Sequence, residues 1–340
     1  MPDRVLVTGI SGFIGGHVAL QLLEAGYVVR GSVRSPDKAD KVRKTLRNAG
    51  ANIARLEFVS LDLLKDTGWT EAMEGVRYLQ HVASPFLINI PRDRNALIRP
   101  AVEGTSHALT AAFRANVERV VLTSSMAAIM YGHDPSRTAP FTADDWTNVD
   151  SPTVNAYVES KYRAERAAWD IVERFGRRND LVTINPGNVY GPLLDNDPGT
   201  SAQVVIRLIN GSLPATARVA MVSIDVRDVA ALHVKAMETP AAGGHRYPMG
   251  NGTYTLAQMA DILRDAFPER ARKIPKVEVP DWVARLFAKF DADMRGNIGE
   301  LGTHKTTDAV DAKALLGRPF ISGEEMFVAT ARSAISQGLA

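Results

Sequence analysis

Two residues with acid–base chemistry stand four positions apart in the stretch "NAYVESKYRAE", which runs from Asn155 to Glu165. Tyr157 carries a phenol and Lys161 carries an ammonium group. The surrounding residues favour a helix, and a spacing of four places both side chains on one helix face. The stretch therefore predicts a phenol and an ammonium group held side by side. Tyr162 lies further round this helix and is predicted to pack rather than react.

Such a pair can transfer a proton to or from a carbonyl oxygen. A free tyrosine has a pKa of about 10, and a neighbouring ammonium lowers that pKa by favouring the phenolate. The phenol can then donate its proton as a hydride reaches the carbonyl carbon. Ser124 and Ser125 end the predicted strand "VERVVLTSS". A serine hydroxyl beside the phenol would orient the carbonyl and stabilise its developing negative charge.

A tyrosine and a lysine at this spacing occur by chance in many chains, so the pair needs a hydride source to support it. The stretch "TGISGFIG" places Gly9, Gly12 and Gly15 between a predicted strand and a predicted helix. Glycines there allow a tight turn and a close backbone approach to a pyrophosphate, and the helix N-terminus favours the anion. The sequence therefore predicts a dinucleotide site, although the spacing is GxxGxxG and a simple tight turn is the alternative.

The residues after the second predicted strand indicate which dinucleotide binds. An Asp or Glu at this point would bind the ribose 2′-hydroxyl of NAD, but the stretch "GSVRSPDK" has no acid before Asp37. Arg34 stands near the expected position, with Lys38 and Lys41 on the following helix. A guanidinium can hold a phosphate through two hydrogen bonds. These residues predict NADP (NADPH) as the cofactor, and Asp62 is a candidate for the adenine amino group.

Short β-branched runs alternate with longer helical stretches through the first part of the chain. This alternation is typical of a parallel sheet covered by helices on both faces. We therefore expect an α/β fold, with a Rossmann-type doubly wound parallel sheet over residues 1–190. Pro and Gly become frequent afterwards, which predicts a smaller C-terminal substrate-binding lobe over residues 191–340. Residues 221–240 read as a strand followed by a helix and are expected to rejoin the first domain.

Composition excludes several classes of function. The 340 residues include no cysteine, which excludes disulfides, thiolate ligands and a cysteine nucleophile. The seven histidines are scattered, so no metal site is expected. A net charge of +2 does not favour nucleic acid or an anionic membrane as a partner. Neither a signal peptide nor an apolar run of membrane-spanning length is recognisable, so the expected location is cytoplasmic.

Taken together, the motifs resemble those of an extended short-chain dehydrogenase/reductase, closest to the dihydroflavonol 4-reductase-like branch. The resemblance covers nearly the whole chain and rests on "VTGISGFIG", "VRGSVRSPDK", "HVASPF", "VEGT", "VVLTSS", "AYVESKYRAERAAW", "VTINPGNVYGP" and "EEMFVATARSAISQGL". It implies reduction of aldehydes and ketones with NADPH. It also implies that Ser125 is the catalytic serine, with Tyr157 as acid/base and Lys161 as its activator.

The resemblance and the positions of the motifs extend the list of predicted site residues. Further predicted cofactor contacts are Phe13, Ile14, Leu63, Val82, Ala83, Ser84, Thr123, Pro186, Asn188 and Val189, in addition to Tyr157 and Lys161. The predicted substrate contacts are Ser84, Phe86, Ser125, Met126, Met130, Tyr157 and Tyr190.

The stretch after the serine departs from the plant flavonoid enzymes, which carry a polar residue there. Met126 and Met130 stand in this stretch, "MAAIMYG". An adaptable apolar wall suits a hydrophobic or aromatic carbonyl substrate better than a polyhydroxylated flavonoid. The alternative is that both methionines fill the core.

Two other functions fit the same scaffold. A nucleotide-sugar epimerase or dehydratase is the first, but dehydratases of that group carry an acid beside the catalytic hydroxyl, where this chain has Met126. A non-catalytic dinucleotide-binding sensor is the second, but such proteins typically lose the tyrosine or lysine that this chain keeps. The wider family often dimerises through the helices flanking the catalytic one, whereas the flavonoid branch can be monomeric, so a homodimer and a monomer both stay open.

Overall fold

The computed structural model describes residues 2–84, 93–290 and 298–340. Phe86, one of the predicted substrate contacts, lies outside these residues.

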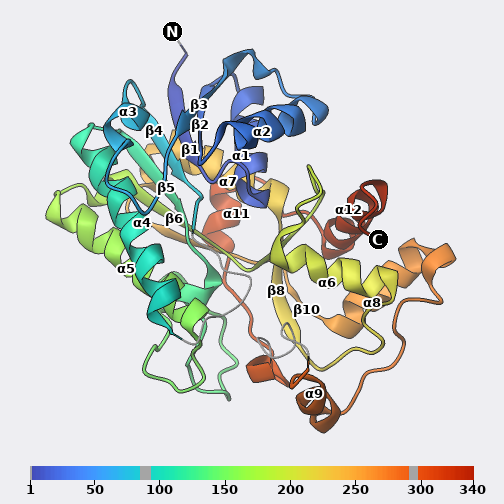
Figure 1. Ribbon diagram of the computed structural model, residues 1–340. Coiled ribbons are helices and arrows are strands. Elements are labelled where there is room, and N and C mark those ends of the chain that lie inside the picture. Colours follow the sequence, from blue (N-terminus) through green and yellow to red (C-terminus); the bar gives the residue numbers. More distant parts are fainter. Residues whose placement is uncertain (1, 85–92, 291–297) are drawn as a thin grey trace.

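The central element is a seven-stranded parallel sheet with the strand order β3-β2-β1-β4-β5-β6-β9 (Figure 1). The order reverses between β1 and β4, which is the topology of a doubly wound sheet. The predicted fold class is therefore confirmed. The strands are β1 (Arg4–Thr8), β2 (Val28–Val33), β3 (Leu56–Ser60), β4 (Tyr78–His81), β5 (Arg119–Thr123), β6 (Leu181–Pro186) and β9 (Arg246–Met249).

Helices cover both faces of this sheet, because successive side chains of each strand point to opposite faces. In β1, Val5 and Val7 face one core cluster whereas Leu6 faces the other. The first face is covered by α1 (Phe13–Glu24), α2 (Pro36–Asn48), α7 (Val226–Glu238) and α11 (Val310–Leu316). The second face is covered by α3 (Trp69–Met73), α4 (Asn95–Arg114) and α5 (Ala156–Arg174).

A second lobe is built on a three-stranded sheet with the order β10-β8-β7. Its strands are β7 (Asn188–Tyr190), β8 (Ala220–Asp225) and β10 (Thr253–Thr255). Its helices are α6 (Gly199–Asn210), α8 (Leu256–Ala266), α9 (Asp281–Phe287) and α12 (Gly323–Ser336). Short 3-10 helices lie at Ile53–Arg55, Met126–Ala128, Arg178–Asp180, Pro240–Ala242, Pro268–Arg270 and Ile298–Glu300.

The two lobes interleave along the chain instead of following one another. Within the predicted range 221–240, β8 belongs to the small sheet, whereas α7 packs against α1 in the first lobe. β9 and α11 also lie with the large sheet, although both come from the range 191–340 expected in the second lobe. β9 is an edge strand, a position that tolerates its Pro248. Four residues containing a proline give little strand signal, so the sequence did not reveal β9.

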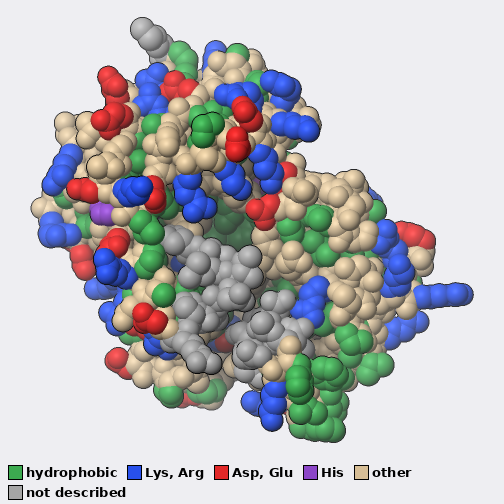
Figure 2. Space-filling model, viewed as in Figure 1, with side chains coloured by type: hydrophobic (Ala, Val, Ile, Leu, Met, Phe, Trp, Pro, Cys, Tyr) green, Lys and Arg blue, Asp and Glu red, His purple; other side chains and the backbone are tan. Residues whose placement is uncertain are grey.

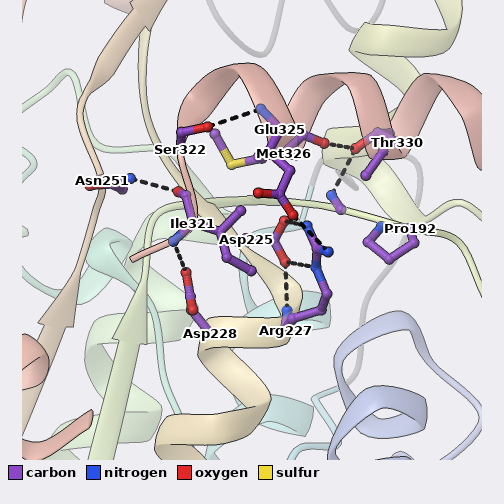
Figure 3. A network of polar contacts seen from close by, with 12 residues as sticks. Pro192, Asp225, Arg227, Asp228, Asn251, Ile321, Ser322, Glu325, Met326 and Thr330 are labelled. Atoms are coloured by element: carbon purple, nitrogen blue, oxygen red, sulfur yellow. Dashed lines mark hydrogen bonds and ion pairs between the residues drawn. The ribbon is translucent and has the colours of Figure 1, made fainter. Parts of the chain in front are cut away.

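A buried polar network joins the lobes where β8 passes into α7 (Figure 3). Asp225 caps α7 by accepting from the Arg227 N–H at 2.8 Å, and its carboxylate also pairs with the Arg227 guanidinium at 2.8 Å. Arg227 reaches Glu325 on α12 at 3.1 Å. Asp228 accepts from the Ile321 N–H at 2.7 Å, just before α12. These contacts fix α12 to the helix that packs on α1, and so set the second lobe against the first.

Candidate functional site

The glycine loop lies where β1 passes into α1. Gly9 has a φ of +71°, and a Cβ there would lie 2.7 Å from the backbone nitrogen of Ala83. A Cβ at Gly15 would lie 2.1 Å from the Gly9 carbonyl oxygen. Gly12 is the N-cap of α1 and has no side chain to cap the helix. The loop therefore holds its backbone close to β4 and leaves the helix N-terminus uncapped by a side chain, which suits a pyrophosphate.

The end of β4 connects this loop to the catalytic helix. His81 ends β4, and its Nδ1 lies 2.9 Å from the Thr8 hydroxyl, directly before Gly9. Burial lowers the pKa of His81 to about 4, and the positive charge of Lys161 acts in the same direction. His81 is therefore neutral near pH 7, within the field of the Lys161 ammonium. The charge of Lys161 therefore acts at the end of β4, where His81 contacts the residue before Gly9.

Tyr157 and Lys161 lie in the first two turns of α5. Asn155 begins this helix because its side chain accepts from the Val158 N–H at 3.0 Å. The Lys161 ammonium lies 5.8 Å from the centre of the Tyr157 ring, and both side chains are partly buried. Tyr162 packs edge-on against Trp146 with ring centres 5.8 Å apart. Tyr162 therefore packs against a neighbouring ring, as its position on the helix predicts.

The two serines at the end of β5 take different partners. Ser124 is buried and donates to the Glu165 carboxylate at 2.5 Å. Ser125 lies beside the Tyr157 side chain, and its hydroxyl acts to lower the pKa of that phenol. Its hydroxyl also accepts from the Ala127 N–H at 3.1 Å, as the cap of the 3-10 helix. The geometry therefore favours Ser125 over Ser124 as the hydroxyl that meets a substrate.

Without a bound cofactor, burial is the main influence on the pKa values of Tyr157 and Lys161. It raises the pKa of Tyr157, while the hydrogen bond from Ser125 acts in the opposite direction. It lowers the pKa of Lys161 to about 8. Desolvation therefore raises the pKa of Tyr157, whereas the sequence predicted that Lys161 would lower it. The phenol is protonated at neutral pH, which is the form that reduction of a carbonyl requires.

The basic residues that were predicted to bind the ribose phosphate lie close together in the chain after β2. Arg34 and Lys38 are exposed at the start of α2, and Lys41 is partly buried one turn later. Lys41 is paired with Asp195 of the second lobe at 2.9 Å. Figure 2 shows Lys and Arg side chains gathered on the large lobe beside the recess between the two lobes. Arg34 and Lys38 are thus the better placed of the three to meet a phosphate from solvent.

The remaining predicted cofactor residues are distributed along the same edge. Leu63 accepts from the His107 ring at 3.0 Å through its carbonyl, and the Asp62 carboxylate accepts from the Leu64 N–H at 3.1 Å. Thr123 does not face outward, because its hydroxyl lies 2.9 Å from Nε2 of the buried His233. Val82, Ala83 and Ser84 follow β4. Pro186 ends β6, and Asn188 and Val189 lie in β7. Phe13 and Ile14 are the first two residues of α1.

The predicted substrate residues are only partly brought together. Met126 and Met130 are buried in a cluster with Phe141 and Val222, so the structure places both in the core. Tyr190 is 0% exposed and packs edge-on against Phe327 with ring centres 5.0 Å apart. Its hydroxyl donates to the Met221 sulfur at 3.4 Å. Tyr190 therefore belongs to the core of the second lobe and not to the catalytic face, because β7 is turned toward α12.

Sequence reasoning missed three residues near the catalytic tyrosine. Tyr131 packs with Tyr157 in one apolar cluster, and burial raises its pKa, followed by the charge of Glu300. The Lys305 ammonium lies 4.1 Å from the centre of the Tyr131 ring and pairs with Glu300 at 2.6 Å. The last two residues come from a Gly-rich stretch that carries no motif, so only the folded chain reveals this cluster.

Two absences hold for the residues that the structure describes. No group of three or more His, Asp or Glu side chains in residues 2–84, 93–290 and 298–340 is arranged to hold a metal ion. Over the same ranges, no helix has both the length and the apolar character needed to cross a membrane.

Comparison with known proteins agrees with this geometry. The model of the NAD dependent epimerase/dehydratase family matches residues 5–250. A Schizosaccharomyces pombe protein named only as an uncharacterized oxidoreductase is 38% identical over 315 residues, which cover 87% of this chain and 91% of the relative. Cinnamoyl-CoA reductase 1 of Petunia hybrida is 38% identical over 269 residues, which cover 78% of each chain.

Among solved structures, the yeast methylglyoxal/isovaleraldehyde reductase in complex with NADPH has a TM-score of 0.80 and 27% sequence identity. The match covers 99% of this chain and 100% of the yeast chain. The resemblance inferred from the motifs is confirmed. The chain belongs to the NAD dependent epimerase/dehydratase family, among the extended short-chain dehydrogenases/reductases.

Proposed function

We propose that this protein reduces an aldehyde or ketone to the alcohol with NADPH as the hydride donor. The observation that carries the proposal is the placement of Ser125 beside Tyr157, with Lys161 on the same helix, at the carboxyl edge that also holds the glycine loop. A phenol, an ammonium group and a hydroxyl converge there next to a site shaped for a dinucleotide. Among its relatives, the Petunia cinnamoyl-CoA reductase and the yeast reductase are named for carbonyl reduction.

The residues present fit the cofactor. Gly9 and Gly15 leave the space that a Cβ would fill, so the backbone can approach a pyrophosphate. Arg34 and Lys38 stand exposed after β2, where an acid would select NAD instead. The yeast reductase was crystallised with NADPH. When bound, the nicotinamide supplies the hydride that the carbonyl carbon receives.

The chain supplies the proton and the orientation. Ser125 would donate a hydrogen bond to the carbonyl oxygen and hold it against the phenol. Tyr157, kept protonated by its raised pKa, would donate its proton to that oxygen as negative charge develops there. The Lys161 ammonium would then stabilise the phenolate left behind and offer its other donors to the nicotinamide ribose. One hydride on carbon and one proton on oxygen complete the alcohol.

The substrate class follows from the surroundings of Tyr157. The nearest clusters are apolar and include Tyr131, Ala127 and Val158. An apolar or aromatic carbonyl compound fits such surroundings better than a nucleotide sugar, which needs many hydrogen-bonding groups. We therefore propose apolar or aromatic carbonyl compounds as the substrates of this chain. We also propose that the protein acts as a monomer or homodimer in the cytoplasm.

The test is NADPH oxidation with methylglyoxal, isovaleraldehyde, aromatic aldehydes and α-keto esters, followed by absorbance and by isolation of the alcohol. We expect turnover with at least one of these compounds, and a far lower rate from the Tyr157→Phe variant under the same conditions. Absence of turnover across the whole panel, with NADPH shown to bind, would contradict the proposed reaction.

A further inference from the structure

Glu165 lies four residues after Lys161, just as Lys161 lies four residues after Tyr157. Tyr157, Lys161 and Glu165 follow one another at intervals of four on α5, so they lie along neighbouring turns of one face. The first two reach the cofactor side of the site. The third is 0% exposed at its side chain and enters the space between the ends of β5 and β6.

The Glu165 carboxylate binds the ends of both strands. It accepts from the Ser124 hydroxyl at 2.5 Å and from the Asn185 amide at 2.7 Å. The same Asn185 amide donates to the backbone carbonyl of Ser125 at 3.3 Å. One carboxylate therefore contacts the residue directly before Ser125 and orients the group that holds the Ser125 backbone.

Arg246 of β9 provides the opposite charge. Its Nε donates to the Glu165 carboxylate at 2.6 Å, and its side chain is only 8% exposed. The guanidinium also donates to the Asp145 carbonyl at 2.7 Å and lies 3.6 Å from the centre of the Trp146 ring. A buried ion pair gains little net stability over apolar packing. Its persistence is better explained by the geometry that it imposes on the groups it binds.

We propose that Glu165, paired with Arg246, is a positioning residue that sets the Ser125 hydroxyl against Tyr157. This inference rests on the proposed carbonyl reduction, because only that reaction gives Ser125 and Tyr157 their roles. The serine must accept from the Ala127 N–H and still meet the phenol. Small rotations of residues 124–125 would break this arrangement, and Glu165 fixes both the side chain before the serine and the amide beneath it.

Glu165→Gln tests the proposal, because it keeps the shape but presents an NH₂ group to donors that need an acceptor. We expect kcat to fall about 10- to 100-fold, the size of effect that a small misplacement produces. The dissociation constant for NADPH should stay unchanged, since Glu165 contacts neither the glycine loop nor Arg34. Glu159→Gln is the matched control, because Glu159 is another α5 carboxylate held in ion pairs, with Arg163 on the same helix and with Arg94 at the start of α4. Its kcat should equal that of the wild type.

A double-mutant cycle separates positioning of Ser125 from a general structural role. Single-turnover NADPH oxidation at high enzyme concentration keeps the slow Ser125→Ala background measurable. If Glu165 acts through Ser125, adding Glu165→Gln to Ser125→Ala should cause no further loss. Losses that multiply in the double variant, or an equal loss of NADPH affinity, would overturn the proposal.

Two further outcomes remain informative. If Glu165→Gln does not fold, Ser124→Ala removes one contact of the carboxylate and should lower kcat less, again without further loss in the Ser125→Ala background. If Ser125→Ala itself turns over as fast as the wild type, the proposed catalytic role of Ser125 fails, and the role of Glu165 fails with it. Failure of the cycle alone would leave the proposed reaction intact.

Discussion

The two ends of the cofactor edge differ in how their side chains are held. At the catalytic end, Ser125, Tyr157 and Lys161 are partly buried and backed by the fully buried Glu165. At the phosphate end, Lys38 is exposed on the first turn of α2, and Arg34 is exposed two residues before that helix. The catalytic groups are ordered by protein contacts before any ligand arrives. The phosphate-binding groups stay solvated until a ligand orders them.

This difference suggests that the two ends serve different purposes, with precise placement of atoms for proton transfer at one end and affinity for the cofactor phosphate at the other. Proton transfer depends on atoms placed within tenths of an ångström, so burial and a second layer of hydrogen bonds are useful there. Attraction of a phosphate depends mainly on charge, which flexible exposed cations supply at little cost in desolvation. Changes at the catalytic end should therefore act on kcat and those at the phosphate end on cofactor affinity.

The largest effect is expected for Tyr157→Phe. Loss of the phenolic proton should lower kcat by about 10²- to 10⁴-fold, the usual contribution of general acid catalysis. NADPH binding, followed by its fluorescence, should be nearly unchanged, because the ring and Lys161 remain. Substantial residual turnover would show that another group donates the proton. The proposed difference between the catalytic end and the phosphate end would then lose its support.

The next effect is expected for Arg34→Ala. A hydrogen bond to a charged group contributes about 1.5–3 kcal/mol, so NADPH affinity should fall about 10- to 100-fold. NADH lacks the 2′-phosphate, so its affinity should hardly change. Titrating both cofactors against the variant tests this, with Arg47→Ala, on the exposed face of the same helix, as the control. Equal losses for both cofactors would show that Arg34 does not contact the phosphate.

The third prediction concerns pH and the catalytic end. Because the pKa of Lys161 is lowered to about 8, its ammonium is present below that pH and is lost as the pH rises through it. The kcat/KM for NADPH reports the free enzyme and should fall about tenfold per pH unit above this value. The raised pKa of Tyr157 keeps the phenol protonated over that range. In Lys161→Arg the decline should move to higher pH, because arginine stays charged. A flat profile from neutral to alkaline pH would contradict the assignment.

The smallest effect is expected for Asp195→Asn, which releases Lys41 from its ion pair between the lobes. Exposed ion pairs contribute about 0–1 kcal/mol, so NADPH affinity should rise only a few-fold as Lys41 becomes available to the phosphate. The gain should shrink as salt is added. Asp197→Asn in the same loop is the control. A loss of affinity in Asp195→Asn would instead mean that the pair holds the loop in place for the cofactor.

The sequence revealed features that depend on neighbours along the chain. The spacing of Tyr157 and Lys161 placed them on one helix face. The glycines predicted a tight turn, which the positive φ of Gly9 makes possible. The alternation of β-branched runs and helical stretches predicted the parallel sheet, but not the short β9 with its Pro248. The function class, the cofactor and the family followed from these local patterns, and the comparisons confirmed them.

Residue type and approximate position do not record which side chains are buried. Tyr190 follows β6 closely, yet it lies in the core of the second lobe against Phe327. Thr123 ends β5 as expected, yet its hydroxyl meets the buried His233. Neither side chain carries a local signal of the direction in which it points.

The reactive groups can be recognised from their near neighbours along the chain, because a period of 3.6 residues and the turn-forming glycines act over a few positions. The way in which those groups are held depends on contacts that form only in the folded chain. Arg246 stands 81 residues after Glu165, and Asn185 stands 60 residues after Ser125, yet Arg246, Glu165 and Asn185 meet behind Ser125. Contacts over such separations depend on the path of the whole chain through both lobes, which no local pattern records. That path turns the tyrosine and lysine of a common motif into an active site.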